Sequence, residues 1–89
     1  MARNFEVLIS GMAYDQKNLS IDVGDTVTWI NDDAVKHSVT TDPGSALSIE
    51  QELDLDPNVY STRQTFSTPG KFSYHCKYHH HMTGSVSVS

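Results

Sequence analysis

Residues 74–84 read Tyr-His-Cys-Lys-Tyr-His-His-His-Met-Thr-Gly and contain the only cysteine of the chain together with four of its five histidines. Cys76, His79 and Met82 follow one another at intervals of three, so a tight loop can direct all three side chains at one ion. Thiolate, imidazole and thioether groups form the ligand set that suits copper. His37 is the only histidine outside this stretch, and a fold that brings it to the loop would supply a second imidazole.

The sequence on either side of this stretch alternates apolar and polar residues with a period of two, which is typical of strands half buried in a sheet. The strongest such run is Thr-Val-Thr-Trp-Ile at residues 26–30, where Val27 and Trp29 are expected to face the core. Residues 49–55 fit either a strand or a one-turn helix capped by Ser48. Six other segments have strand character between turn signals: residues 5–9, 19–23, 35–40, 62–66, 71–76 and 85–89.

These patterns predict an all-β fold, a two-sheet antiparallel Greek-key β-sandwich of about seven or eight strands, as a single domain over residues 1–89. Alternation places His37 on the apolar face of its segment, between Val35 and Val39. It places Cys76, the last residue of the 71–76 segment, on the inner face of that segment, whereas His75 points to the other side. Both inward-facing residues lie beside turns and are expected at one end of the sandwich.

The loop after Cys76 adds His79 and Met82 at that same end. Two histidines and a cysteine with a weak axial methionine make the mononuclear type 1 copper site of electron-transfer proteins. Zinc also binds cysteine and histidine, but a methionine is not among its usual ligands. Taken singly, Cys76 also fits a buried thiol and His37 a core histidine, and only their combination favours a metal site.

Composition excludes several other classes of function. The chain has six basic and eleven acidic residues and a formal net charge of −5, which argues against binding to nucleic acid and suits a positively charged protein partner. No apolar run approaches the roughly 18 residues of a membrane span. A single cysteine excludes a disulfide within the chain.

Four stretches of the sequence resemble the cupredoxins, the small blue copper proteins that include plastocyanin, amicyanin and pseudoazurin. They are Gly-Asp-Thr-Val-Thr-Trp-Ile-Asn at 24–31, Val-Lys-His-Ser-Val at 35–39, Thr-Pro-Gly-Lys-Phe-Ser-Tyr-His-Cys at 68–76 and Met-Thr-Gly-Ser-Val-Ser-Val at 82–88. The short interval between His79 and Met82 is most similar to that of amicyanin. The resemblance extends over nearly the whole chain except residues 42–61.

The resemblance implies that His37, Cys76 and His79 are equatorial copper ligands and that Met82 is the axial one. It implies a one-electron carrier rather than an enzyme, a monomer that docks redox proteins at the His79 end, where residues 12–14 lie beside the histidine. Cupredoxins are usually exported, so we expect a periplasmic or extracellular protein whose leader is absent from this chain.

Two positions depart from the family pattern. Ser38 stands where the residue after the first histidine is commonly asparagine, whose side chain helps to hold the loop. His80 and His81 stand between His79 and Met82, where a proline often follows the histidine, and either can compete with Met82 as the fourth ligand. These extra histidines keep two alternatives open: a copper-binding or delivery module, and an open-site copper enzyme acting on a small molecule such as a nitrogen oxide.

Overall fold

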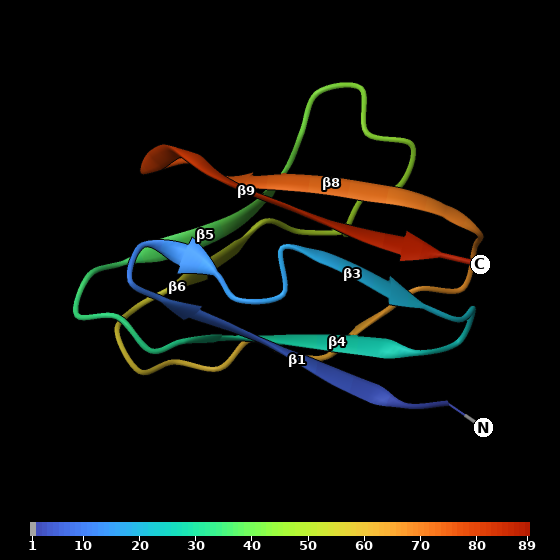
Figure 1. Ribbon diagram of the computed structural model, residues 1–89, viewed down its shortest axis with the longest axis horizontal. Coiled ribbons are helices and arrows are strands. Elements are labelled where there is room, and N and C mark those ends of the chain that lie inside the picture. The colour runs from blue at the N-terminus through green and yellow to red at the C-terminus, as the bar shows by residue number, and fades with distance from the viewer. Residues whose placement is uncertain (1) are drawn as a thin grey trace.

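The computed structural model describes residues 2–89, which form two β-sheets packed face to face (Figure 1). One sheet has the strand order β2-β1-β4-β7 and the other the order β3-β9-β8-β5-β6. The strands are β1 Asn4–Ser10, β2 Ala13–Tyr14, β3 Asn18–Ile21, β4 Thr26–Asn31, β5 His37–Thr41, β6 Leu53–Leu55, β7 Gln64–Thr65, β8 Gly70–Cys76 and β9 His79–Val88. Within the described residues, no helix has the length and apolar character needed to cross a membrane.

The predicted all-β sandwich is confirmed, but its sheets are mixed rather than wholly antiparallel. Strand β1 runs parallel to β4, and β3 runs parallel to β9. The reason is the path of the chain, which leaves the first sheet after β2, forms β3 in the second sheet and returns as β4. Parallel neighbours need such a crossover, whereas the β8–β9 pair is a hairpin.

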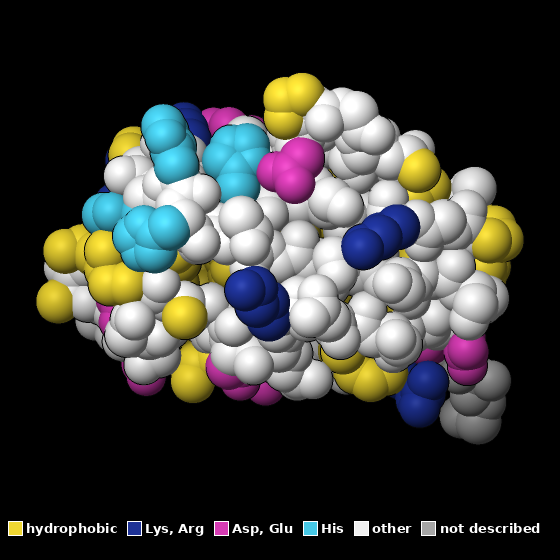
Figure 2. Space-filling view, turned by 45° about the horizontal axis from the view of Figure 1, so that its top comes forward, with side chains coloured by type: hydrophobic (Ala, Val, Ile, Leu, Met, Phe, Trp, Pro, Cys, Tyr) yellow, Lys and Arg dark blue, Asp and Glu magenta, His cyan; other side chains and the backbone are white. Residues whose placement is uncertain are grey.

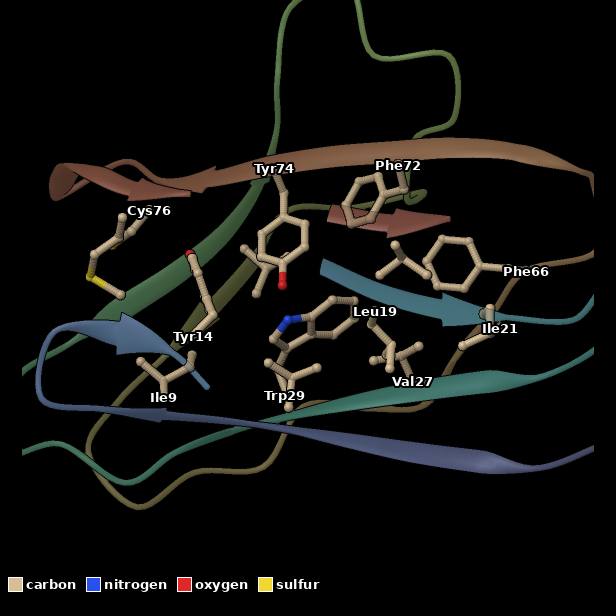
Figure 3. Packing of buried hydrophobic residues seen from close by; sticks show 14 of the residues in the cluster. Ile9, Tyr14, Leu19, Ile21, Val27, Trp29, Phe66, Phe72, Tyr74 and Cys76 are labelled. Atoms are coloured by element: carbon tan, nitrogen blue, oxygen red, sulfur yellow. The ribbon is translucent and has the colours of Figure 1, made fainter. Parts of the chain in front are cut away.

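The core lies between the sheets and is formed by the alternating residues that the sequence pattern indicates (Figure 3). Val27 and Trp29 of β4 are completely buried, as predicted. Trp29 packs edge-to-face on Tyr74 of β8, with ring centroids 5.4 Å apart and planes at 85°. Tyr74 also meets Tyr14 edge-to-face at 4.8 Å, so an aromatic column joins the two sheets beside Cys76.

Two local predictions need correction, and the structure decides between the two readings of residues 49–55. Val35 precedes β5 and is 45% exposed, because the strand begins only at His37 and the turn before it leaves the core. Residues 49–55 contain a strand and no helix, but the strand, β6, covers only Leu53–Leu55, the part that pairs with β5 at the edge of the sheet. Strand β9 begins at His79, because Cys76 pairs with His79 across a turn of only Lys77 and Tyr78.

Asp25 ties the start of β4 to the N-terminal segment. Its side chain is almost completely buried, and its carboxylate accepts the backbone N–H groups of Arg3 at 2.8 Å and of Asp22 at 2.9 Å. These backbone hydrogen bonds, with the Arg3 guanidinium, lower the pKa of Asp25 despite its burial. A carboxyl group with a lowered pKa in the folded state contributes stability above its unfolded pKa, and this contribution is lost as the pH falls through the folded value.

We therefore expect Asp25→Asn to lower the free energy of unfolding at pH 7 and to flatten its dependence on pH below about 4, where free aspartate titrates. An amide has only one acceptor oxygen, so its NH2 group must face one of the two backbone donors. Urea unfolding between pH 2 and 7 measures both effects. Glu50→Gln, at an exposed position, is the control, and an unchanged pH slope in the Asp25 variant would contradict this assignment.

Candidate metal centre

The structure places the four predicted ligands at one end of the sandwich, on three adjacent strands. His37 is the first residue of β5, Cys76 the last of β8 and His79 the first of β9, which also carries Met82. His37 and Cys76 are completely buried, Met82 is 2% exposed and His79 is half-buried. Cys76 and Met82 belong to the same cluster of buried side chains. His37, Cys76 and His79 lie at strand ends, where the inner face of a strand meets a turn, and Met82 lies further along β9.

His37 and Cys76 face each other across this end of the core. The Nδ1 atom of His37 lies 3.7 Å from the Sγ atom of Cys76, although 39 positions separate them in the chain. The other ring nitrogen, Nε2, is 2.8 Å from an oxygen of Asp33. A carboxylate at Nε2 fixes the ring orientation and holds a proton on that nitrogen, which leaves Nδ1 free to bind a metal.

Asp33 also fixes the neighbouring β1–β2 hairpin. Its carboxylate accepts the backbone N–H groups of Gly11 at 2.8 Å and Met12 at 3.0 Å. Burial alone would raise the pKa of Asp33, but these N–H groups and His37 outweigh burial and lower it. Gly11 and Met12 have positive φ angles of 61° and 62°, as a two-residue hairpin turn requires. Asp33 therefore joins the His37 ring to the tip of this hairpin.

Sequence reasoning did not identify Asp33 as part of the site. The available signal was an aspartate four residues before the histidine, in the turn that follows the strongest strand. Ion pairing between such neighbours is common on a helix, but in a turn the spacing carries no comparable expectation. Only the fold shows that the turn bends back far enough for the carboxylate to reach the ring.

Ser38, next to His37, contacts the sulfur and the turn after it. Its backbone N–H donates to the Cys76 Sγ at 3.4 Å, and its carbonyl accepts the Tyr14 hydroxyl at 2.5 Å. Its side-chain oxygen accepts the backbone N–H of Lys77 at 2.9 Å. The Ser38 hydroxyl thus holds the turn, and the Ser38 backbone N–H group contacts the sulfur directly.

The remaining histidines surround the buried pair but do not enter it. The His79 ring lies 5.1 Å from the His37 ring and 6.5 Å from the His81 ring, between centroids. His80 and His81 are exposed. His75 points away from the sulfur, as predicted, and bonds Asp42 through Nδ1 at 2.5 Å. Figure 2 shows the histidine side chains gathered at one end of the surface, with an acidic side chain next to one of them.

The donor set fits copper better than a harder metal. Across residues 2–89, no group of three or more His, Cys, Asp or Glu side chains is already arranged to hold a metal ion. Among the predicted ligands, His37 and Cys76 lie 3.7 Å apart. His79 stands one ring away, and a thioether lies in the same buried cluster. A cysteine sulfur, a methionine thioether and an imidazole whose Nε2 is bound to a carboxylate form a donor set that favours copper.

The comparisons with known proteins agree with this chemistry. The sequence profile of the family described as copper binding proteins, plastocyanin/azurin family, matches residues 2–89. The chain is 37% identical over 82 residues to amicyanin of Paracoccus denitrificans, covering 90% of this chain and 61% of that protein. It is 33% identical over 89 residues to amicyanin-alpha of Methylorubrum extorquens, covering 98% of this chain and 73% of that protein.

Solved structures of amicyanin variants are similar over most of the chain. An oxidized variant superposes with a TM-score of 0.82 and 35% identity, covering 96% of this chain and 81% of the other. A second variant, described in its Cu(I) form, gives a TM-score of 0.82 at 33% identity with the same coverage. The chain thus spans about three-fifths to four-fifths of the length of these relatives.

Proposed function

Because the chain belongs to the plastocyanin/azurin family of copper-binding proteins, we propose that it carries single electrons between redox proteins through one type 1 copper held by His37, Cys76, His79 and Met82. The observation that carries this proposal is the buried contact of 3.7 Å between the His37 Nδ1 and Cys76 Sγ atoms. Copper in such a site supplies a one-electron change between Cu(II) and Cu(I).

Hydrogen bonds from neighbouring residues hold the proposed ligand atoms in place. Asp33 fixes the His37 ring, and the Ser38 N–H group fixes the sulfur of Cys76. Both supports come from strand ends and turns packed on the core, and ligands supported in this way need little rearrangement when the charge of the site changes. Fast electron exchange requires such a site.

His79 is the group through which we propose electrons enter and leave. It is half-buried, whereas His37 and Cys76 are completely buried. The adjacent Tyr78 is 43% exposed, and Figure 2 shows further apolar side chains around the histidines. A redox protein can exclude water by packing on this surface, and the net charge of −5 suits a partner with a basic face. An exported location, as expected for the family, completes this proposal.

Met82 rather than His80 or His81 is the expected fourth ligand, because the thioether is buried beside the sulfur whereas both histidines are exposed. Met82→Gln replaces a soft donor with a harder oxygen, which favours Cu(II), so we expect a lower reduction potential and a changed visible spectrum. His80→Ala and His81→Ala should leave the spectrum as it is. A spectrum that changes with either alanine variant and not with Met82→Gln would assign the fourth ligand to a histidine.

The exposed His80 and His81 favour one alternative, capture and delivery of copper. The two functions differ in the rate at which metal leaves the protein. A carrier shows reversible one-electron voltammetry and rapid electron self-exchange, and it loses copper to a chelator slowly. A delivery protein passes copper within seconds to an acceptor, and the His80→Ala/His81→Ala double variant slows that transfer.

A further inference from the structure

Each of the two residues between Cys76 and His79 is bound to an acidic side chain. One of these acidic residues lies just before the edge strand β6 and the other lies within it. The Lys77 ammonium group donates to the Glu52 carboxylate at 2.5 Å. The Tyr78 hydroxyl donates to the Asp54 carboxylate at 2.8 Å. Lys77 and Tyr78 are the whole turn of the β8–β9 hairpin, so each corner of that turn has its own acidic partner.

The contacts of Lys77 close into a ring. Its backbone N–H donates to the Ser38 hydroxyl at 2.9 Å, and that oxygen is 2.8 Å from the Thr40 hydroxyl. Thr40 donates to the second oxygen of Glu52 at 2.9 Å, since a carboxylate can only accept. Ser38 must then be the donor to Thr40. The ring thus runs from the Lys77 backbone through two hydroxyl groups of β5 to Glu52 and back to the Lys77 side chain.

The second corner is held by a parallel arrangement. Asp54 lies opposite Ser38 in the β5–β6 register and also pairs with Lys36 at 3.6 Å, which keeps its carboxylate on the side of the turn. The Lys77 ammonium lies 5.3 Å from the centre of the Tyr78 ring, so the two corners contact each other. β6 is the edge strand of its sheet. Its one acidic residue, Asp54, accepts the hydroxyl group of Tyr78 in the turn.

We propose that Glu52 and Asp54 are positioning residues that set the geometry of the turn between the two metal-binding residues Cys76 and His79. This inference rests on the proposed function, because it assigns the turn its role at the copper site. Single exposed ion pairs contribute little to stability. Here several hydrogen bonds connect one two-residue turn to neighbouring strands. We expect their effect to be local, because they limit opening of the turn without determining the free energy of global unfolding.

The direct test is amide hydrogen exchange of the metal-free protein, comparing Glu52→Gln, Lys77→Gln and their double variant. We expect each single change to speed exchange of the Lys77 amide, which donates to the Ser38 hydroxyl, about five-fold. The double variant should show no further increase, because the two residues act as one pair. The amides of Phe72 and Tyr74 in β8 should keep their wild-type rates. Asp56→Asn is the matched control, since Asp56 also pairs with Lys36 but touches neither corner.

In the copper-loaded protein, the same variants distinguish an effect on the position of the turn from an effect of the changed charge. Loss of an acidic and loss of a basic group shift a reduction potential in opposite directions by charge alone. A positioning role instead speeds copper release to a chelator in both single variants, again about five-fold. The exchanged pair Glu52→Lys/Lys77→Glu should restore the slow rates. Tyr78→Phe, which removes the hydroxyl that binds Asp54, should speed release as well.

Unchanged exchange of the Lys77 amide, additive effects in the double variant, or equal acceleration at Phe72 would overturn the positioning role. Release rates that move in opposite directions in the two single variants would overturn it too. If the wild-type protein forms no thiolate–copper bond, the proposed function fails, while exchange in the metal-free protein still decides whether these residues hold the turn.

Discussion

Cys76→Ser is expected to abolish the intense visible absorption of the copper-loaded protein. That absorption requires charge transfer from a sulfur ligand, and Cys76 is the only cysteine. Loss of outer partners alone lowers metal affinity about 10- to 100-fold, so loss of the thiolate itself should lower copper affinity by more than about 100-fold. Competition titrations with a chelator, monitored together with the visible spectrum, measure both quantities.

Serine preserves the size and hydrogen-bonding capacity of the position, so the Ser38 N–H group keeps an acceptor and the fold should remain. Circular dichroism of the metal-free variant checks this point. His75→Ala is the control, because His75 neighbours Cys76 in the chain but binds Asp42 on the outer side of the sheet. An intense band that survives in the serine variant would exclude Cys76 as the ligand.

Gly84→Ala is expected to destabilise the fold by about 3 kcal/mol, the upper part of the usual range for overpacking a core. Gly84 lies opposite Tyr74 in the β8–β9 pair, and the tyrosine ring lies over it. A Cβ atom at Gly84 would be 2.5 Å from both the Cζ and the hydroxyl oxygen of that ring. The ring has little room to move, because Tyr74 is completely buried between Tyr14 and Trp29.

Urea unfolding of the metal-free variant measures this loss of stability. The Tyr74→Leu background provides the matched test, because a shorter side chain removes the ring atoms that meet the new methyl group. There, Gly84→Ala should cost less than about 1 kcal/mol, the range of ordinary surface and strand substitutions. A similar loss in both backgrounds would mean that the conformation of the glycine backbone, and not the Tyr74 ring, determines the effect.

The parts of the fold that follow from local patterns were predictable. Alternation in residues 26–30 correctly placed Val27 and Trp29 in the core. The same rule placed His37 and Cys76 on inward faces near strand ends. Their proximity was therefore predictable although 39 positions separate them in the chain. The pattern was informative here because the inner face of a sandwich strand is continuously apolar, so a lone inward histidine or cysteine stands out.

Features that depend on pairing between distant segments were not predictable in this way. The exposure of Val35 depends on where β5 begins, and the start of β9 at His79 depends on its pairing with Cys76. Asp33 contacts the β1–β2 turn and Glu52 contacts the β8–β9 turn, and both turns are distant from these residues in the sequence. Neither residue alters the periodicity of its own segment, so the alternation pattern does not reveal its role.

Binding of copper by the Cys76 sulfur is tested most directly by adding Cu(II) to the metal-free wild-type protein and recording its visible absorption and EPR spectra. We predict an intense sulfur-to-copper band that saturates at one equivalent, with a narrow copper hyperfine splitting. A pale solution with only weak ligand-field bands and a wide splitting would contradict the proposed type 1 copper site. Cys76 would then not bind the metal, and a histidine-based copper chelator would be the better description of this protein.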